Sequence, residues 1–115
     1  MKIKFEATIN NMSLKKDGEY RIEFKVPLLG ISRAISMVRL LGTSFKVGII
    51  STEKSKAVIE GASFFRLIID REGESKIMLS FNFAGISNDS LAFFGQHQEE
   101  TVMVIIKGGE NESKD

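Results

Sequence analysis

Gly30-Ile31-Ser32 and Gly85-Ile86-Ser87 are the same tripeptide, and they stand 55 positions apart in a chain of 115 residues. Sliding the sequence over itself by this distance gives nine identities without a gap, against roughly three or four expected by chance. The remaining identical pairs fall at turns and at matching strand positions: Ala7/Ala62, Gly18/Gly73, Glu19/Glu74, Ile22/Ile77, Val47/Val102 and Ile50/Ile105. Because a fixed period sets the architecture, we predict an internal duplication in residues 1–107, with repeats 1–52 and 57–107.

The first repeat predicts two strands, a helix and a third strand. Residues 3–9 alternate between apolar and polar, and the phase changes after Asn10-Asn11, which predicts a bulge or a break. A second strand alternates over residues 20–28 and is ended by Pro27, and a third covers residues 45–50. Between them, a helix over residues 30–41 is predicted from an apolar stripe at helical spacing: Ile31, Ala34, Ile35, Val38 and Leu41.

The second repeat follows the same order less regularly. The apolar run of residues 64–69 predicts a strand that is buried on both faces or lies at a protomer interface. A strand over 77–83, a short helix ending near residue 94 and a strand over 101–107 follow, while 51–56 resembles a polar linker and 108–115 a disordered polar tail. We therefore predict a β-rich α+β fold with about six strands, two short helices and a closed or partly closed sheet with pseudo-twofold symmetry.

Composition limits the class of protein. Hydrophobic residues make up 43% of the chain and charged residues 27%, which is typical of a domain with a real core. The chain has no cysteine, and this excludes disulfides and thiolate metal sites. Its sequence has no apolar run near the ~20 residues of a membrane-spanning helix and no apolar signal core at its start, so a cytoplasmic protein without a membrane partner is expected.

Little in the sequence indicates catalysis. His97 is the only histidine and stands in a polar stretch that is typical of a loop. The carboxylates are scattered, no glycine-rich phosphate loop is present, and no serine has the spacing of a nucleophile elbow. We therefore predict that the protein is not an enzyme and has no catalytic residue, metal site or cofactor.

Charge is distributed unevenly along the chain. Residues 1–54 have a balance of +5 and residues 55–115 a balance of −4, which gives the net charge of +1. The basic side chains of the first half predict a nucleic-acid contact, with Tyr20 or Phe45 available for base stacking unless both belong to the core. The residues expected to bind are Lys15, Lys16, Arg21, Lys25, Arg33 and Arg39. The leading hypothesis is an accessory binding protein for nucleic acid or its processing machinery.

A second hypothesis is a protein-interaction or inhibitor module without nucleic-acid affinity. Met37 and Leu40 lie on the side of the predicted helix opposite its apolar stripe, where they form an outer contact surface, or are buried against the other repeat or in a looser core. This surface and the acidic second half would bind a protein partner, and a homo-oligomer is expected.

Two known architectures resemble this order of elements. Residues 21–28, Val38-Arg39-Leu40-Leu41-Gly42 and residues 45–50 are similar to the strand, helix and closing strand of a double-psi β-barrel of the cradle-loop group. The same order resembles one domain of a DNA sliding clamp. The short, cysteine-free chain with its polar tail is similar in style to small phage or prophage proteins, although the fold resemblance does not imply a particular function.

Overall fold

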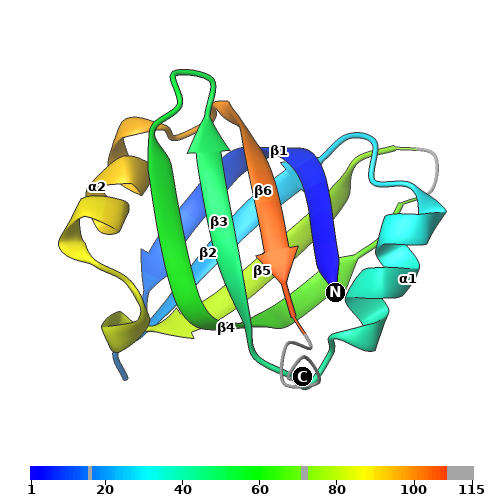
Figure 1. Cartoon of the computed structure of the whole chain (residues 1–115), viewed down its shortest axis with the longest axis horizontal. Helices are drawn as coiled ribbons and strands as arrows, with labels where there is room; N and C mark the ends of the chain where they lie inside the picture. Colours follow the sequence, from blue (N-terminus) through cyan, green and yellow to red (C-terminus); the bar gives the residue numbers. More distant parts are fainter. Residues whose placement is uncertain (16, 71–72, 109–115) are drawn as a thin grey trace.

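The computed structural model describes residues 1–15, 17–70 and 73–108, and it shows a closed barrel of six strands flanked by two helices (Figure 1). The strands are β1 (Lys2–Leu14), β2 (Glu19–Val26), β3 (Phe45–Ser51), β4 (Lys56–Ile68), β5 (Ser75–Asn82) and β6 (Thr101–Lys107). Helix α1 (Ile31–Arg39) connects β2 to β3, and α2 (Asn88–Gln96) connects β5 to β6 after a short 3-10 turn at Phe83–Gly85. The predicted β-rich α+β fold with a closed sheet is confirmed.

The two predicted repeats contribute three strands each to one barrel. Around the barrel the order is β1-β2-β5-β4-β3-β6, and every neighbouring pair is antiparallel. This order is unchanged when β1, β2 and β3 exchange places with β4, β5 and β6. The duplication of the sequence and the twofold symmetry stay predictions, because connectivity alone does not test them.

Strict alternation fills the barrel. Side chains of a strand point to opposite faces in turn, so every second residue points into the closed sheet. In β2 these inward residues are Ile22, Phe24 and Val26, all fully buried, and the opposite β3 contributes Val47 and Ile49. The strand predicted to end at Pro27 ends at Val26.

Bulges interrupt the two longest strands. The register of β1 shifts between Ile9 and Asn11, where the sequence predicted a bulge, and that of β4 shifts between Phe64 and Arg66. The β4 bulge places Phe64 inside and its neighbour Phe65 outside. The expectation that residues 64–69 are buried on both faces is therefore wrong, since Phe65, Ile68 and Ile69 are all more than a third exposed.

The residues between the repeats form a hairpin. Ser51 is buried, and its hydroxyl accepts a hydrogen bond from the Ser55 amide at 3.1 Å, which closes a tight turn from β3 into β4. Residues 51–56 are thus part of the sheet and its turn, which corrects the predicted linker. At the chain end, Gly108 and Met1 exchange hydrogen bonds at 2.8 and 3.0 Å, and residues 109–115 of the predicted tail lie outside the described residues.

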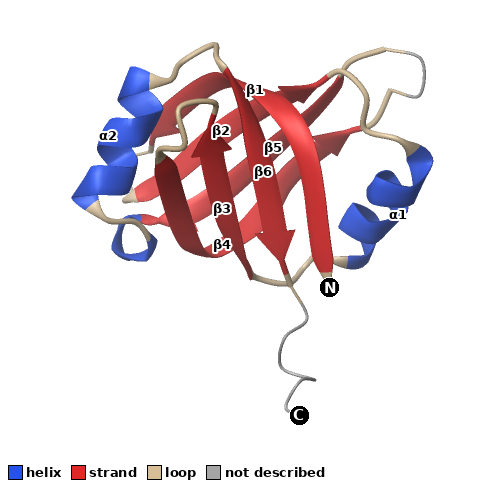
Figure 2. Ribbon diagram, turned by 45° about the horizontal axis from the view of Figure 1, so that its top comes forward, coloured by secondary structure: helices blue, strands red, loops and turns tan. Residues whose placement is uncertain are grey.

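Each helix covers a strand edge that the barrel leaves open. The first half of β1 pairs with β6 and only its second half with β2, and β4 divides its pairing between β3 and β5 in the same way. Helix α1 lies along the open half of β1 and α2 along that of β4 (Figure 2). Arg33 Nε donates to the Lys4 carbonyl at 2.7 Å, and the Val58 amide donates to Ser90 Oγ at 3.1 Å.

Helix α1 is turned differently from the sequence-based expectation. Met37 and Leu40, predicted to form an outer surface, are buried, and Ala34 is the third buried residue on this side. The side chain of Leu40 fills the space next to Gly108, where an added Cβ would lie 2.8 Å from Leu40 Cδ2. Met37 and Leu40 are therefore buried, and four of the five residues of the stripe predicted to face the core, all but Ala34, face outward.

Candidate nucleic-acid interface

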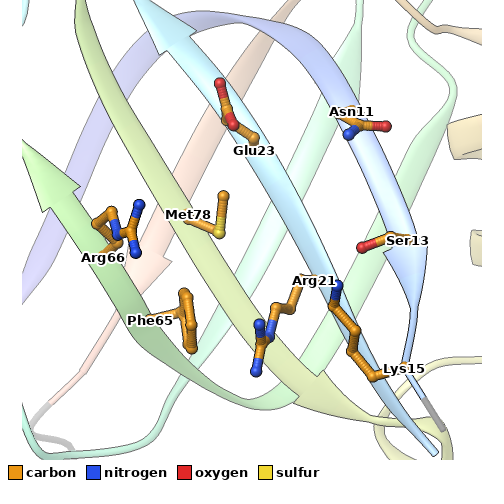
Figure 3. A pocket seen from close by; sticks show the side chains of 8 residues that line it. All are labelled: Asn11, Ser13, Lys15, Arg21, Glu23, Phe65, Arg66 and Met78. Carbon is orange, nitrogen blue, oxygen red and sulfur yellow. The ribbon is translucent and has the colours of Figure 1, made fainter.

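The outer surface of β1, β2, β5 and β4 has a shallow hollow of about 310 Å³. The pairing of these strands brings side chains from distant parts of the chain together: Ser13 lies opposite Arg21, Glu23 opposite Met78, and Met78 opposite Arg66. Figure 3 shows the eight side chains that line the hollow, namely Asn11, Ser13, Lys15, Arg21, Glu23, Phe65, Arg66 and Met78. Three of the eight are cationic.

An arginine stacked on an exposed phenylalanine is the most distinctive feature of this hollow. The guanidinium carbon of Arg21 lies 3.7 Å from the centroid of the Phe65 ring, and that of Arg66 lies 5.8 Å from it. Glu19 Oε2 accepts a hydrogen bond from Arg21 Nε at 3.1 Å and so orients the guanidinium group. A planar cation held over an aromatic ring offers both positive charge and a flat surface.

Two lysines extend this positive surface along the same strands. Lys25 of β2 lies directly opposite Lys76 of β5. Two like charges in such a cross-strand pair repel each other, so their placement costs stability unless an anion lies between them. Two carboxylates interrupt the surface, and both have partners, since Glu19 binds Arg21 and Glu23 accepts from Asn10 Nδ2 at 2.8 Å. We call this set the cation–aromatic face: Lys15, Arg21, Lys25, Phe65, Arg66 and Lys76.

The five predicted binding residues that the structure describes do not form one surface. Lys15, Arg21 and Lys25 lie on the cation–aromatic face, whereas Arg33 and Arg39 belong to α1. Arg33 is also engaged with the backbone, because Nη1 donates to the Leu29 carbonyl at 3.1 Å in addition to the bond with Lys4. Lys16 lies outside the described residues.

The two aromatic residues considered for base stacking are occupied inside the protein. Phe45 is buried, with its ring centroid 4.7 Å from that of Phe64. Tyr20 is partly buried between Phe81 and Phe83, at centroid distances of 5.5 and 6.1 Å. Both therefore belong to the core or its margin, which is the alternative that the sequence left open.

Sequence reasoning missed Phe65, Arg66 and Lys76, all from the second half of the chain. Lys76 could have been found from the alternation of its strand, which places it outward. Phe65 and Arg66 lie at the β4 bulge, and no periodic signal marks them because the surrounding run is apolar on both sides.

A second group of lysines lies on the other side of the barrel. Lys2, Lys107 and Lys46 follow one another across β1, β6 and β3, next to a hollow of about 250 Å³ beside Gly48. Counting around the barrel, β3 lies opposite β2 and β6 opposite β5, and Figure 1 shows β3 and β6 in front of them. This surface has no exposed aromatic ring among the described residues that line its hollow.

His97 is buried directly after α2. Its Nδ1 lies 2.8 Å from Glu100 Oε1, and its ring centroid is 4.4 Å from that of Phe93, so the side chain packs against the helix end. Among the described residues, 1–15, 17–70 and 73–108, there is no group of three or more histidine, cysteine or acidic side chains that could hold a metal ion. The described helices are all too short or too polar to cross a membrane.

Comparisons with protein-family models, with curated proteins and with solved structures find no match to this chain. The fold and the surface define a class of structure, a closed six-stranded antiparallel barrel with a cationic and aromatic outer face. The resemblances to cradle-loop barrels and sliding-clamp domains stay expectations.

Proposed function

We propose that the protein is a non-enzymatic accessory protein that binds single-stranded nucleic acid on the cation–aromatic face. The observation that carries the proposal is the Arg21 guanidinium stacked on Phe65, with Lys15 and Arg66 around the same hollow. Proteins that bind single strands without sequence preference combine cations, which neutralise phosphates, with flat groups on which bases stack.

Each part of the face has a role in this proposal. A base stacks on the outer side of the Arg21 guanidinium or on the uncovered part of the Phe65 ring, which is 41% exposed. Lys15 and Arg66 flank that position and bind the phosphates on either side. The Lys25–Lys76 pair continues the path along the strands, and a phosphate between the two ammonium groups relieves their repulsion.

The binding test is fluorescence anisotropy with labelled single- and double-stranded oligonucleotides, at low and at physiological salt. We expect micromolar affinity for single strands that weakens steeply with salt, because phosphate contacts release counterions. If neither the single-stranded nor the double-stranded oligonucleotide binds at low salt, the proposal is wrong.

Variants distinguish binding at the cation–aromatic face from non-specific electrostatic attraction between the protein and nucleic acid. Charge reversal by Arg21→Glu and Lys25→Glu should weaken binding and flatten the salt slope by about one unit per lost phosphate contact. Phe65→Ala should cost about 1–3 kcal/mol of binding free energy through lost stacking. The matched control is Lys46→Glu with Lys107→Glu, which changes charge equally on the opposite side of the barrel. Equal losses in the two double variants would reject the assignment to this face.

A further inference from the structure

Helix α1 presents a broad apolar surface to solvent. Its outward residues, together with a leucine before it and another after it, are between 49% and 87% exposed: Leu28, Ile31, Ile35, Val38 and Leu41. Single exposed hydrophobic residues are ordinary on protein surfaces, but several large ones at helical spacing, here Ile31, Ile35 and Val38, mark an interaction site. We call this group the α1 stripe.

The fold does not require the α1 stripe. The barrel covers the other side of the helix, where Ala34, Met37 and Leu40 are buried. An amphipathic helix on one core needs a single apolar face with polar residues opposite. In α1 the apolar residues extend well beyond the buried side, and the polar residues are Ser32, Ser36, Arg39 and Arg33, the last of which bonds to β1.

Helix α2 is an internal control for this conclusion. Both helices have nine residues, and positions 1, 5 and 8 are exposed in both. Helix α1 has Ile31, Ile35 and Val38 at these positions, whereas α2 has Asn88, Ala92 and Gly95. Two residues after the helix, Leu41 corresponds to Gln98. A helix that packs against this barrel can therefore have polar or small residues on its outer side, as α2 does.

The area of the α1 stripe fits a second copy of the chain. Exposed fractions of this size correspond to on the order of 500 Å² of apolar surface, near the upper end of the largest patch on a typical monomer. Two copies joined through this surface would together bury at most about 1,000 Å², which is the lower limit for a biological interface, so a weak dimer is expected. A twofold contact also needs no other protein, because both copies contribute the same surface.

Charge favours an antiparallel arrangement of the two helices. Arg39 is the basic residue in the last turn of α1, and Glu74 directly precedes Ser75, which pairs with Val26 at the end of β2. The connection from β4 to β5 thus lies at the barrel end where α1 begins, as Figures 1 and 2 both show. In an antiparallel pair, Arg39 of each copy approaches the end of the other that carries Glu74, and the helix dipoles oppose each other favourably.

We propose that the α1 stripe is the contact surface of a symmetric homodimer, with the two α1 helices packed antiparallel. The hollow at Arg21 and Phe65 stays uncovered in this dimer, since Arg21 lies near the start of β2 and α1 follows its end, where Lys25 and Lys76 of the cation–aromatic face lie.

The test is sedimentation velocity of the whole chain from micromolar to millimolar concentration. The wild type should sediment as a dimer, and Ile35→Gln with Val38→Gln should sediment as a monomer. Glutamine is a better helix former than isoleucine or valine, so these changes leave α1 intact. The matched control is Ile68→Gln on β4, where the exposed fraction is 48% against 49% for Ile35. This control should remain dimeric.

Orientation is tested by exchange of charges. Arg39→Glu alone should raise the dissociation constant several-fold, and Arg39→Glu with Glu74→Arg should restore it. A wild type that is monomeric at millimolar concentration overturns the dimer, and so does a dimer that Ile35→Gln with Val38→Gln leaves unchanged. Failure of the charge exchange to restore affinity overturns the antiparallel arrangement. If the double variant fails to fold, amide hydrogen exchange of wild-type α1 decides, since its protection should rise with protein concentration and must stay constant without a dimer.

Discussion

Helices α1 and α2 cover matching edges of the barrel, but different side chains attach them to it. The third residue of each helix makes the hydrogen bond to the third residue of the neighbouring long strand, Arg33 to Lys4 in α1 and Ser90 to Val58 in α2. At the seventh position both bury a large side chain completely, Met37 and Phe94. The inner sides thus share one structural task. Only the outer sides differ, so the outer side is where the sequence is free to serve another purpose.

The largest effect is expected at the shared inner position. Phe94→Ala should lower the free energy of unfolding by about 4 kcal/mol and Met37→Ala by about 3 kcal/mol, because each leaves a cavity in a packed interior. The methionine loses less, since its side chain is smaller than that of phenylalanine and leaves a smaller cavity. Urea denaturation of both variants measures these values. A loss below about 1 kcal/mol for Met37→Ala would show that the barrel does not hold this side of α1.

The orientation of α1 shows where sequence reasoning reaches its limit. Apolar residues cover more than half of the helix circumference, and two stripes satisfy helical spacing equally well. The choice between them depends on contacts with the rest of the fold, since Met37 and Leu40 are buried and Arg33 donates to the Lys4 carbonyl of β1. The bond to Lys4 joins residues 29 positions apart, so periodicity alone could not select the correct side.

The strands were more predictable than the site. Alternation in residues 20–26 identified the inner and outer side chains of β2, and the phase change at Asn10-Asn11 identified the bulge. The stacking of Arg21 on Phe65 depends on the order β2-β5-β4 and on a bulge hidden in an apolar run. Sequence could therefore give three cations of the face, Lys15, Arg21 and Lys25, but not Arg66, Lys76 or the aromatic residue among them.

A smaller effect is expected where each helix bonds to its strand. Ser90→Ala should cost about 1–2 kcal/mol, because the Val58 amide loses its buried partner. Arg33→Ala should cost less, since Arg33 is exposed and water can replace it at the Lys4 carbonyl. Thermal unfolding of the two variants gives the ranking, and Ser87→Ala, which removes only the hydroxyl that caps α2, serves as the reference. The reverse ranking would mean that the arginine fixes α1 more firmly than the serine fixes α2.

The smallest effect is expected on the outer side of α1. Ile35→Ala should change the unfolding free energy of the monomer by less than about 0.5 kcal/mol, because the side chain is half exposed and alanine favours the helix. Urea denaturation at protein concentrations too low for self-association measures the unfolding free energy of the monomer. The variant for comparison is Met37→Ala, two residues later. At high protein concentration the Ile35→Ala variant should unfold at a lower urea concentration than the wild type, since binding between native copies stabilises the wild type. An Ile35→Ala loss equal to that of Met37→Ala in the monomer would mean that the barrel, and not a second copy, accounts for the α1 stripe.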